Sequence, residues 1–190
     1  MNDENVSSDH SGEAPGDLAV VQAFINSADL EQGTDELATP EGLARWLRER
    51  SLLAPGDRVH EADVARALTI REGLRALAFA NTGEDLDRRA VDDLNRVAAT
   101  IPIHIGLGVD GVSLHAECDG ALGALGWIIA TAYEAKVEGT WDRFKACRKD
   151  SCRWAFYDHS KNRSRTWCSM AVCGNRIKAQ TYRERARVQS

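Results

Sequence analysis

A chain of 190 residues, 43% hydrophobic and 28% charged, is long enough for one ordinary globular domain and a small appended module. The first 17 residues are polar and acidic, unlike a signal peptide, and the longest apolar stretch, 120–133, is shorter than the about 20 residues that cross a bilayer. We therefore expect a cytoplasmic protein that does not enter the membrane.

The net charge of −5 conceals two segments of opposite sign. Residues 141–190 hold 13 Lys and Arg against 4 Asp and Glu, a net charge of +9, whereas residues 1–140 hold 11 against 25, a net charge of −14. Segments that differ this much in charge have different electrostatic tasks. We expect a disordered acidic lead at 1–17, a first domain at 18–140 that folds alone, and a basic module at 141–190.

Helical periodicity begins at Leu18 and recurs in three further segments. The second helix has a clear start, because Thr39 can cap it and Pro40 suits the first helical position. Apolar residues spaced three and four apart predict two more helices, at about 61–80 and about 86–99. The pattern therefore indicates a largely helical first domain.

Between 101 and 118 the apolar pattern changes from helical to alternating. Asp110 and Gly111 separate two alternating runs, and an Asp-Gly pair in this setting predicts a tight hairpin turn because glycine readily adopts positive φ. A fifth helix follows at about 119–137. The expected fold class is α+β: a mostly helical N-terminal domain with a small antiparallel hairpin, followed by a distinct C-terminal module.

Four of the five cysteines lie in the basic module. Cys147 and Cys152 form one C-x4-C pair, Cys168 and Cys173 form a second, and fifteen residues separate the pairs. Two close pairs joined by a loop can supply the four thiolates of a tetrahedral zinc site. We therefore predict one structural Zn²⁺ in a treble-clef-like finger, with no open position for a catalytic water.

Other interpretations of the cysteines stay open. They could be free thiols in a small core, or His159 could act as a ligand, although four thiolates already complete a closed site. A redox dithiol would need a Cys-x-x-Cys pair, which the sequence lacks. The fifth cysteine, Cys118, lies in the hairpin segment and is interpreted as a small buried residue.

The segment around the second cysteine pair resembles a known family. Residues 167–176, which read WCSMAVCGNR, and Lys178 after them are similar to the CGNR zinc finger of bacterial proteins. Asp158, Ser160 and Asn162 upstream also fit the pattern of that family. The resemblance agrees with a zinc finger at this end of the chain.

The N-terminal half is similar to the ABATE domain, which is usually paired with this finger. The similarity lies in Phe24–Ser27 and in the predicted helix and loop at 43–53. Thr166 departs from the finger pattern, where a second Arg often stands; this removes one possible contact with phosphate and leaves the metal ligands unaffected. The resemblance implies a zinc-binding, stress-responsive transcription regulator.

Positive charge surrounds the predicted finger. With four thiolates and one Zn²⁺ the module still carries about +7, and such basic surfaces attract phosphates. On a helix turning 100° per residue, the basic side chains of the tail lie on more than one side. We predict contacts with nucleic acid, most simply DNA, from seven residues: Lys161, Arg163, Arg165, Arg176, Lys178, Arg183 and Arg187.

Different functions compete with DNA binding. The alternative is a protein–protein adaptor, because the acidic first domain is a ready partner for a basic finger. Aromatic residues between the cysteine pairs could stack on bases, but a finger this small needs apolar filler, and we favour filler. No Ser-His-Asp order, phosphate loop or paired carboxylates stand out, so we do not expect an enzyme. The N-terminal domain is interpreted as a sensor or a dimerisation unit, which allows a homodimer.

Overall fold

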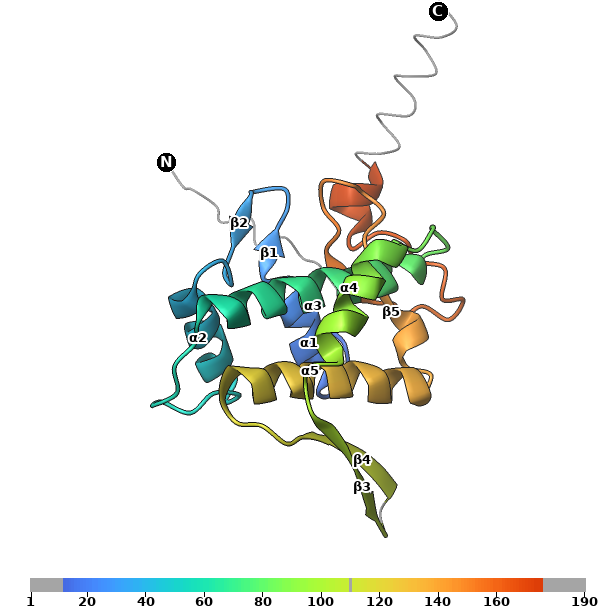
Figure 1. Cartoon of the computed structure of the whole chain (residues 1–190). Helices are drawn as coiled ribbons and strands as arrows, with labels where there is room; N and C mark the ends of the chain where they lie inside the picture. Colours follow the sequence, from blue (N-terminus) through green and yellow to red (C-terminus); the bar gives the residue numbers. More distant parts are fainter. Residues whose placement is uncertain (1–11, 110, 176–190) are drawn as a thin grey trace, which may run out of the picture.

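The computed structural model describes residues 12–109 and 111–175, and five α-helices form the body of that part of the chain. Three of them meet at the centre and the other two pack at their sides (Figure 1). No helix within the described residues has the length and apolar character to cross a membrane. The central helices are α1 (Leu18–Ile25), α3 (Glu61–Ala80) and α5 (Gly120–Val137); the flanking ones are α2 (Pro40–Glu49) and α4 (Arg88–Ala98).

The helix starts follow from local capping. The Thr39 hydroxyl accepts a hydrogen bond from the Gly42 N–H at 3.1 Å, and Pro40 opens α2, as predicted. At the start of α3, the Asp63 carboxylate accepts from the His60 N–H at 3.0 Å. These bonds satisfy N–H groups that have no partner inside the helix. The α+β fold class and all five predicted helices are confirmed.

One continuous apolar core holds the helices together. Phe24 and Trp46 meet edge to face with ring centroids 5.6 Å apart. Gly73 lets α4 approach α3 closely, because a Cβ there would lie 2.4 Å from the Cβ of Leu94. The largest fully buried side chains of this core are Phe24, Ile25, Leu37, Leu43, Trp46, Leu47, Ile70, Leu125, Ile128, Trp141 and Phe144.

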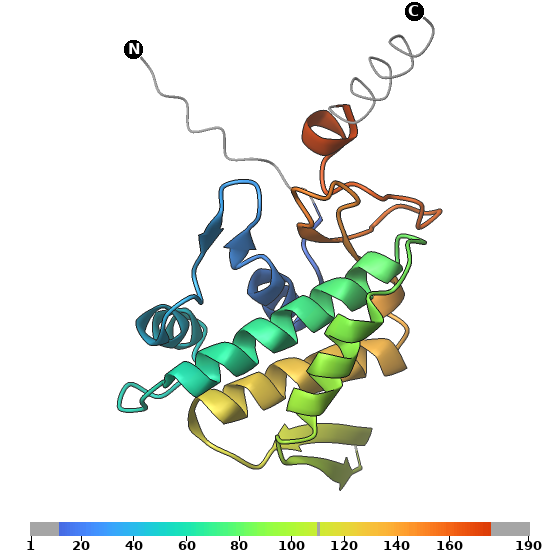
Figure 2. The ribbon, with the colours of Figure 1, turned by 45° about the horizontal axis from the view of Figure 1, so that its top comes forward.

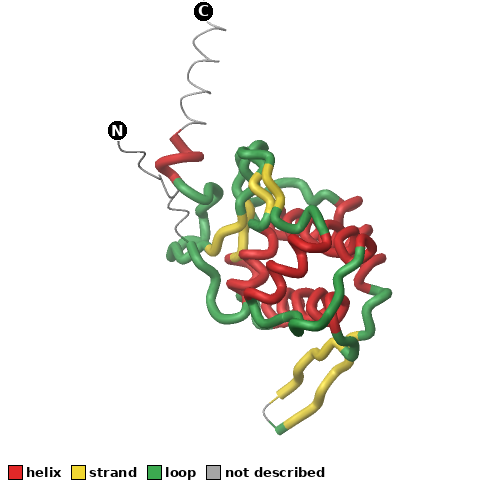
Figure 3. The backbone as a smooth tube through the Cα atoms, turned by 90° about the vertical axis from the view of Figure 1, so that its left-hand side faces the viewer, coloured by secondary structure: helices red, strands yellow, loops and turns green. Residues whose placement is uncertain are grey.

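Three two-stranded antiparallel hairpins complete the described fold. The predicted Asp-Gly hairpin is present and protrudes from the helical body (Figure 3), with Gly108 paired to Gly111 at its tip. Of the two shorter hairpins, the sequence predicted only a short strand at 154–157 in the finger, because strands of two or three residues leave too few alternations to detect. The pairs are β1 (Ala28–Asp29) with β2 (Thr34–Asp35), β3 (Ile103–Gly108) with β4 (Gly111–Ala116), and β5 (Phe144–Ala146) with β6 (Ala155–Tyr157).

The hairpin β5–β6 belongs to the core of the helical domain. Phe144, Ala146 and Ala155 are fully buried in the same cluster as α1, α3 and α5. The side chains of Gln22 in α1 and of Asn26, which directly follows α1, both donate to the Ala155 carbonyl, at 3.1 and 2.9 Å. Figure 2 shows the finger segment beside the C-terminal end of α3. The boundary near 140 therefore divides the chain by charge and motif, but the packing is continuous across it.

Residues 12–14 pack against α1 and the finger, whereas the sequence assigned all of 1–17 to a disordered lead. Ala14 is buried, and its N–H donates to the Gln22 side chain at 2.7 Å. The Gly12 carbonyl accepts from the Tyr157 N–H at 2.8 Å, which extends the edge of β6. Polar composition was a poor guide here because these bonds come from the main chain. The rest of the predicted lead, 1–11, lies outside the described residues.

Candidate metal centre

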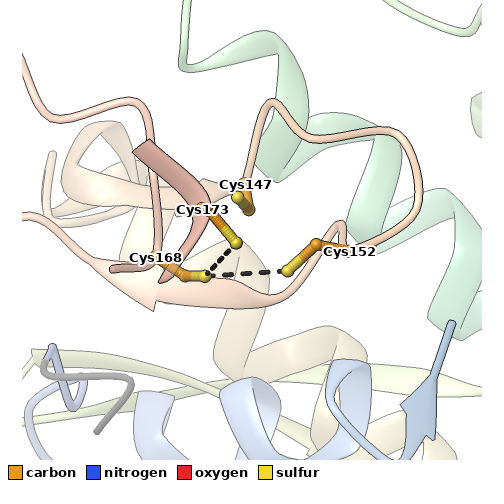
Figure 4. Close-up of side chains that lie close together, drawn as sticks. All are labelled: Cys147, Cys152, Cys168 and Cys173. Carbon is orange, nitrogen blue, oxygen red and sulfur yellow. Dashed lines mark hydrogen bonds between the residues drawn. The ribbon is translucent and has the colours of Figure 1, made fainter. Parts of the chain in front are cut away.

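The four predicted ligands come together in one buried cluster. The sulfurs of Cys147, Cys152, Cys168 and Cys173 all lie within 4.8 Å of one another (Figure 4). Cys168 Sγ is 3.6 Å from both Cys152 Sγ and Cys173 Sγ, far beyond a disulfide bond of about 2.05 Å. Each of the four residues is at most 5% exposed. The cluster is a set of four free thiol groups that converge on one point.

The geometry fits a tetrahedral zinc ion. Zn–S bonds of about 2.3 Å at tetrahedral angles place the sulfurs about 3.8 Å apart, close to the observed 3.6 Å. Four protein ligands fill the coordination shell, so the ion has a structural role and no open position for chemistry. Among the described residues, no other group of His, Cys, Asp and Glu forms such a cluster.

Close packing of the sulfurs separates their pKa values. Hydrogen bonds from Cys152 and Cys168 lower the pKa of Cys147 to about 2. The contact with Cys147 raises the pKa of Cys152 to about 12 and raises that of Cys168 as well, while burial raises the pKa of Cys173. Thiols this close cannot all ionise unless a cation balances their charge. Zn²⁺ supplies that charge when bound, so its binding releases protons and weakens in acid.

Tight turns hold each cysteine pair. Cys147 follows β5, and its N–H donates to the Trp154 carbonyl at 2.9 Å, which closes the first pair into a knuckle. Inside that knuckle the Cys152 N–H donates to the Lys149 carbonyl at 2.8 Å. The second pair closes through the short π-helix η2 (Met170–Gly174), where the Cys173 N–H donates to the Ser169 carbonyl at 2.9 Å. Both chelates are therefore fixed by main-chain bonds.

Aromatic side chains surround the sulfurs. Phe156 is fully buried against the cysteine cluster, and Trp154 and Trp167 pack on it while partly exposed. The Arg165 guanidinium lies 4.9 Å from the centre of the Phe156 ring and donates to the Trp167 carbonyl at 2.8 Å. The buried Phe156 fills the interior of the module beside the sulfurs.

A buried ion pair fixes the loop that leads to the second cysteine pair, and the sequence analysis missed it. Lys145 Nζ is 2.8 Å from Asp158 Oδ2 and also donates to the carbonyls of Arg163 and Arg165, at 2.5 and 3.1 Å. The Asp158 carboxylate in turn accepts from the N–H groups of Ser160 and Arg165. Burial alone would raise the pKa of Asp158, but these hydrogen bonds lower it to about 2.

The seven predicted nucleic-acid contacts fall into three groups. Lys161 and Arg163 are exposed on the loop beside the metal centre. Arg165 points inward instead, where its guanidinium donates to the carbonyls of Trp167 and Cys168, so its charge serves the finger's own structure. The remaining four, Arg176, Lys178, Arg183 and Arg187, lie outside the described residues.

The alternative ligand His159 and the fifth cysteine, Cys118, do not belong to the cluster. His159 Nε2 is 2.8 Å from the Glu13 carbonyl oxygen, and its ring lies tilted by 56° against that of Tyr157, with the ring centroids 5.0 Å apart. Cys118 follows β4 at the opposite end of the described fold and is partly exposed, so its interpretation as a buried residue is wrong.

The cysteine knuckle is attached to the acidic N-terminal domain. Lys149 Nζ is 2.8 Å from Glu31, and Arg148 forms an ion pair with Glu84. The guanidinium of Arg75, a buried residue of α3, donates to the carbonyls of Arg153 in the knuckle and Ile25 in α1, at 3.2 and 2.7 Å. The metal centre is thus connected to the helical domain by charge and by a buried bridge.

The fold and the site define a helical α+β domain joined to a four-cysteine zinc finger. Residues 18–135 match the ABATE family, described as "Putative stress-induced transcription regulator", and residues 143–186 match the CGNR zinc finger. The chain belongs to the ABATE family, in the architecture that ends with a CGNR finger. No curated protein matches the chain at a significant level.

Proposed function

We propose that the chain is a cytoplasmic transcription regulator whose finger binds DNA and whose N-terminal domain senses a signal or dimerises. The loop 161–164 beside the metal centre supports this proposal best. Its Lys161 and Arg163 side chains are exposed, and neither takes part in an ion pair within the part of the chain that is described. Two unpaired cations on one short loop form an attractive site for phosphates.

The loop is preorganised for such contacts. The buried Lys145 ammonium donates hydrogen bonds to the carbonyls of Arg163 and Arg165. The Arg163 backbone adopts a φ of 49°, which residues other than glycine seldom take. Less backbone freedom is lost when an already ordered loop binds a ligand. The zinc ligand Cys168 anchors the end of this segment, so the proposed role of the metal is to position basic side chains.

Salt dependence of binding tests the proposal. Replacing both Lys161 and Arg163 with Ala should weaken binding to a random DNA duplex and flatten the slope of log K against log salt by about 0.9 for each phosphate that the variant no longer neutralises. The control removes the same charge away from the finger, through Arg45→Ala in α2 with Arg58→Ala in the loop after it, both exposed (Figure 1). Zinc content is measured in each protein. Equal slopes for the two double variants would contradict the proposal.

The predicted tail contacts need their own test. Arg183→Ala with Arg187→Ala should flatten the same salt slope without releasing zinc, because both positions lie well beyond the last ligand in sequence. If the slope stays unchanged and thermal stability falls at low salt, these arginines pair with the acidic domain instead.

A protein–protein adaptor is the second candidate, and the ion pairs of the knuckle favour it. Lys149 with Glu31 and Arg148 with Glu84 join the basic finger to the acidic domain within one chain. In the adaptor role the finger would make contacts of this kind with another acidic surface. If the chain does not bind DNA at low salt but its finger binds an acidic protein surface, the adaptor function is supported and the regulator function is not.

A further inference from the structure

Among the described residues, most of the exposed large apolar side chains lie together in one patch away from the metal centre. Nine large hydrophobic side chains are exposed within the described residues, and six of them come from the β3–β4 hairpin and the C-terminal half of α5. On the hairpin, Leu107 is 83% exposed and Ile105 and Val112 are each 68% exposed; on the helix, Tyr133 is 56% and Val137 is 70% exposed.

These side chains belong to two adjoining faces. The strand register pairs Ile105 with Leu114 and Leu107 with Val112, so the alternation of the strands places all four on one face of the hairpin. Ala116 stands on the same face at the base of the hairpin.

The hairpin packs along α5 from Gly126 towards Glu134, whose carboxylate accepts from the Leu114 N–H. A Cβ on Gly126 would lie 2.7 Å from the Cβ of Ala116, so the strand and the helix touch there. Tyr133 and Val137 follow Gly126 by seven and eleven residues and therefore share its face of α5. One face of α5 is therefore covered by the hairpin at Gly126 and exposed further along, at Tyr133 and Val137.

We propose that this surface is the contact between two copies of the chain, in which the hairpin of each copy covers the exposed α5 face of the other. The inference gives a surface to the dimerising role proposed for the N-terminal domain and rests on that role. It does not depend on DNA binding by the finger.

The composition of the hairpin supports an occupied surface. The twelve residues of β3 and β4 include no Lys, Arg, Asp or Glu, and both strands are edges of a two-stranded sheet. Proteins normally protect such edges with charges, prolines or bulges, because exposed apolar edges associate. The Glu134 carboxylate of α5 accepts from the Leu114 N–H of β4 at 3.1 Å. The apolar face of the hairpin itself carries no charge, and we expect it to be covered in the assembled protein.

The size of the surface suits a dimer. Side chains exposed to this degree form an apolar patch on the order of 500 Å², at the upper end of what a monomer usually shows. The main chain of the two strands and the flanking polar residues would bring the buried area near the about 800 Å² per partner of a specific interface.

The arrangement also favours a second copy over an unrelated partner. A two-fold contact requires that one chain carry both a surface and its complement. Here a protruding apolar arm and an exposed apolar helix face stand side by side in the same chain. The hairpin lies at the opposite end of the described fold from the metal centre, so both fingers of such a dimer would remain uncovered (Figure 1).

Sedimentation equilibrium of the full-length, zinc-loaded chain without DNA tests this inference. The molecular mass measured for the wild type should be twice that of one chain. Leu107→Lys with Val112→Lys should raise the dimer dissociation constant by at least about tenfold, since the interface would then bury two lysines. Tyr133→Lys should do the same from the helix side. Because these side chains are exposed in the single chain, helical content and zinc content should stay unchanged.

The matched control is His115→Lys, which adds a charge to the other face of the same hairpin. It should leave the dimer intact. A wild type that stays monomeric at high concentration would overturn the inference, and so would a dimer that the hairpin and helix variants leave as tight as the control. DNA binding to a short duplex is measured separately, so a failure of one proposal does not count against the other.

Discussion

Replacing Asp158 with Asn should destabilise the chain by about 3–5 kcal/mol, because it leaves the Lys145 ammonium buried without its counter-charge. The two side chains are 4% exposed for Lys145 and 0% for Asp158, so water cannot take the place of the carboxylate. The carbonyls of Arg163 and Arg165 still accept from Lys145. The amide oxygen of the variant can still accept a main-chain N–H, so the removal of the negative charge is the dominant change.

Urea and thermal unfolding, with zinc content measured, check this magnitude. A loss of 3–5 kcal/mol is a large part of the about 5–15 kcal/mol that typically stabilises a folded chain. At about 2–4 °C per kcal/mol for a chain of this size, the midpoint should fall by about 10 °C. The control is Asp150→Asn, which breaks an ion pair between Arg153 and a 92% exposed carboxylate and should change little. If both variants unfold at the same midpoint, the reasoning about burial is wrong.

Three further predictions concern metal, packing and pH. Cys168→Ser should lose the single zinc and unfold the finger, which elemental analysis and circular dichroism would detect; a full complement of zinc would refute the assignment. The isolated fragment 18–140 should be much less stable than the whole chain, because it lacks Phe144 and Ala155 of its own core; a wild-type melting point would contradict this. The unfolding free energy of the wild type should exceed that of Asp158→Asn by the whole difference above about pH 4, and this difference should shrink as the pH falls towards 2, which urea unfolding at each pH would measure. The reason is that the pKa of Asp158 is lowered to about 2 in the folded chain.

Features that depend on neighbours in sequence could be predicted. Thr39 and Pro40 start a helix whatever the rest of the chain does, and Asp110 with Gly111 sets a turn through its own backbone preferences. In each C-x4-C pair, likewise, the short spacing in sequence allows two thiols to bind the same metal ion. The sequence predicted the five helices, the long hairpin and the metal ligands for this reason.

Features that depend on distant partners could not be predicted. The residues next to Lys145 in sequence give no sign that its side chain forms a buried ion pair with a carboxylate thirteen residues further along the chain. Arg165 was assigned to nucleic acid because it lies among other cations, yet its guanidinium folds back on its own finger. Charge patterns show how many cations a segment holds, whereas packing decides which of them face solvent.

The contacts between the cysteine knuckle and the helices couple zinc binding to the stability of the N-terminal domain. Arg75 holds the Ile25 carbonyl of α1 and the Arg153 carbonyl of the knuckle with the same guanidinium. Zinc that binds only the folded knuckle therefore also stabilises the contacts that α1 and α3 make with it. Any change that loosens the helices around Arg75 should in turn weaken zinc binding, because linkage acts equally in both directions. If the N-terminal domain senses a signal, as we propose, the Arg75 bridge is the direct connection through which that signal would reach the finger.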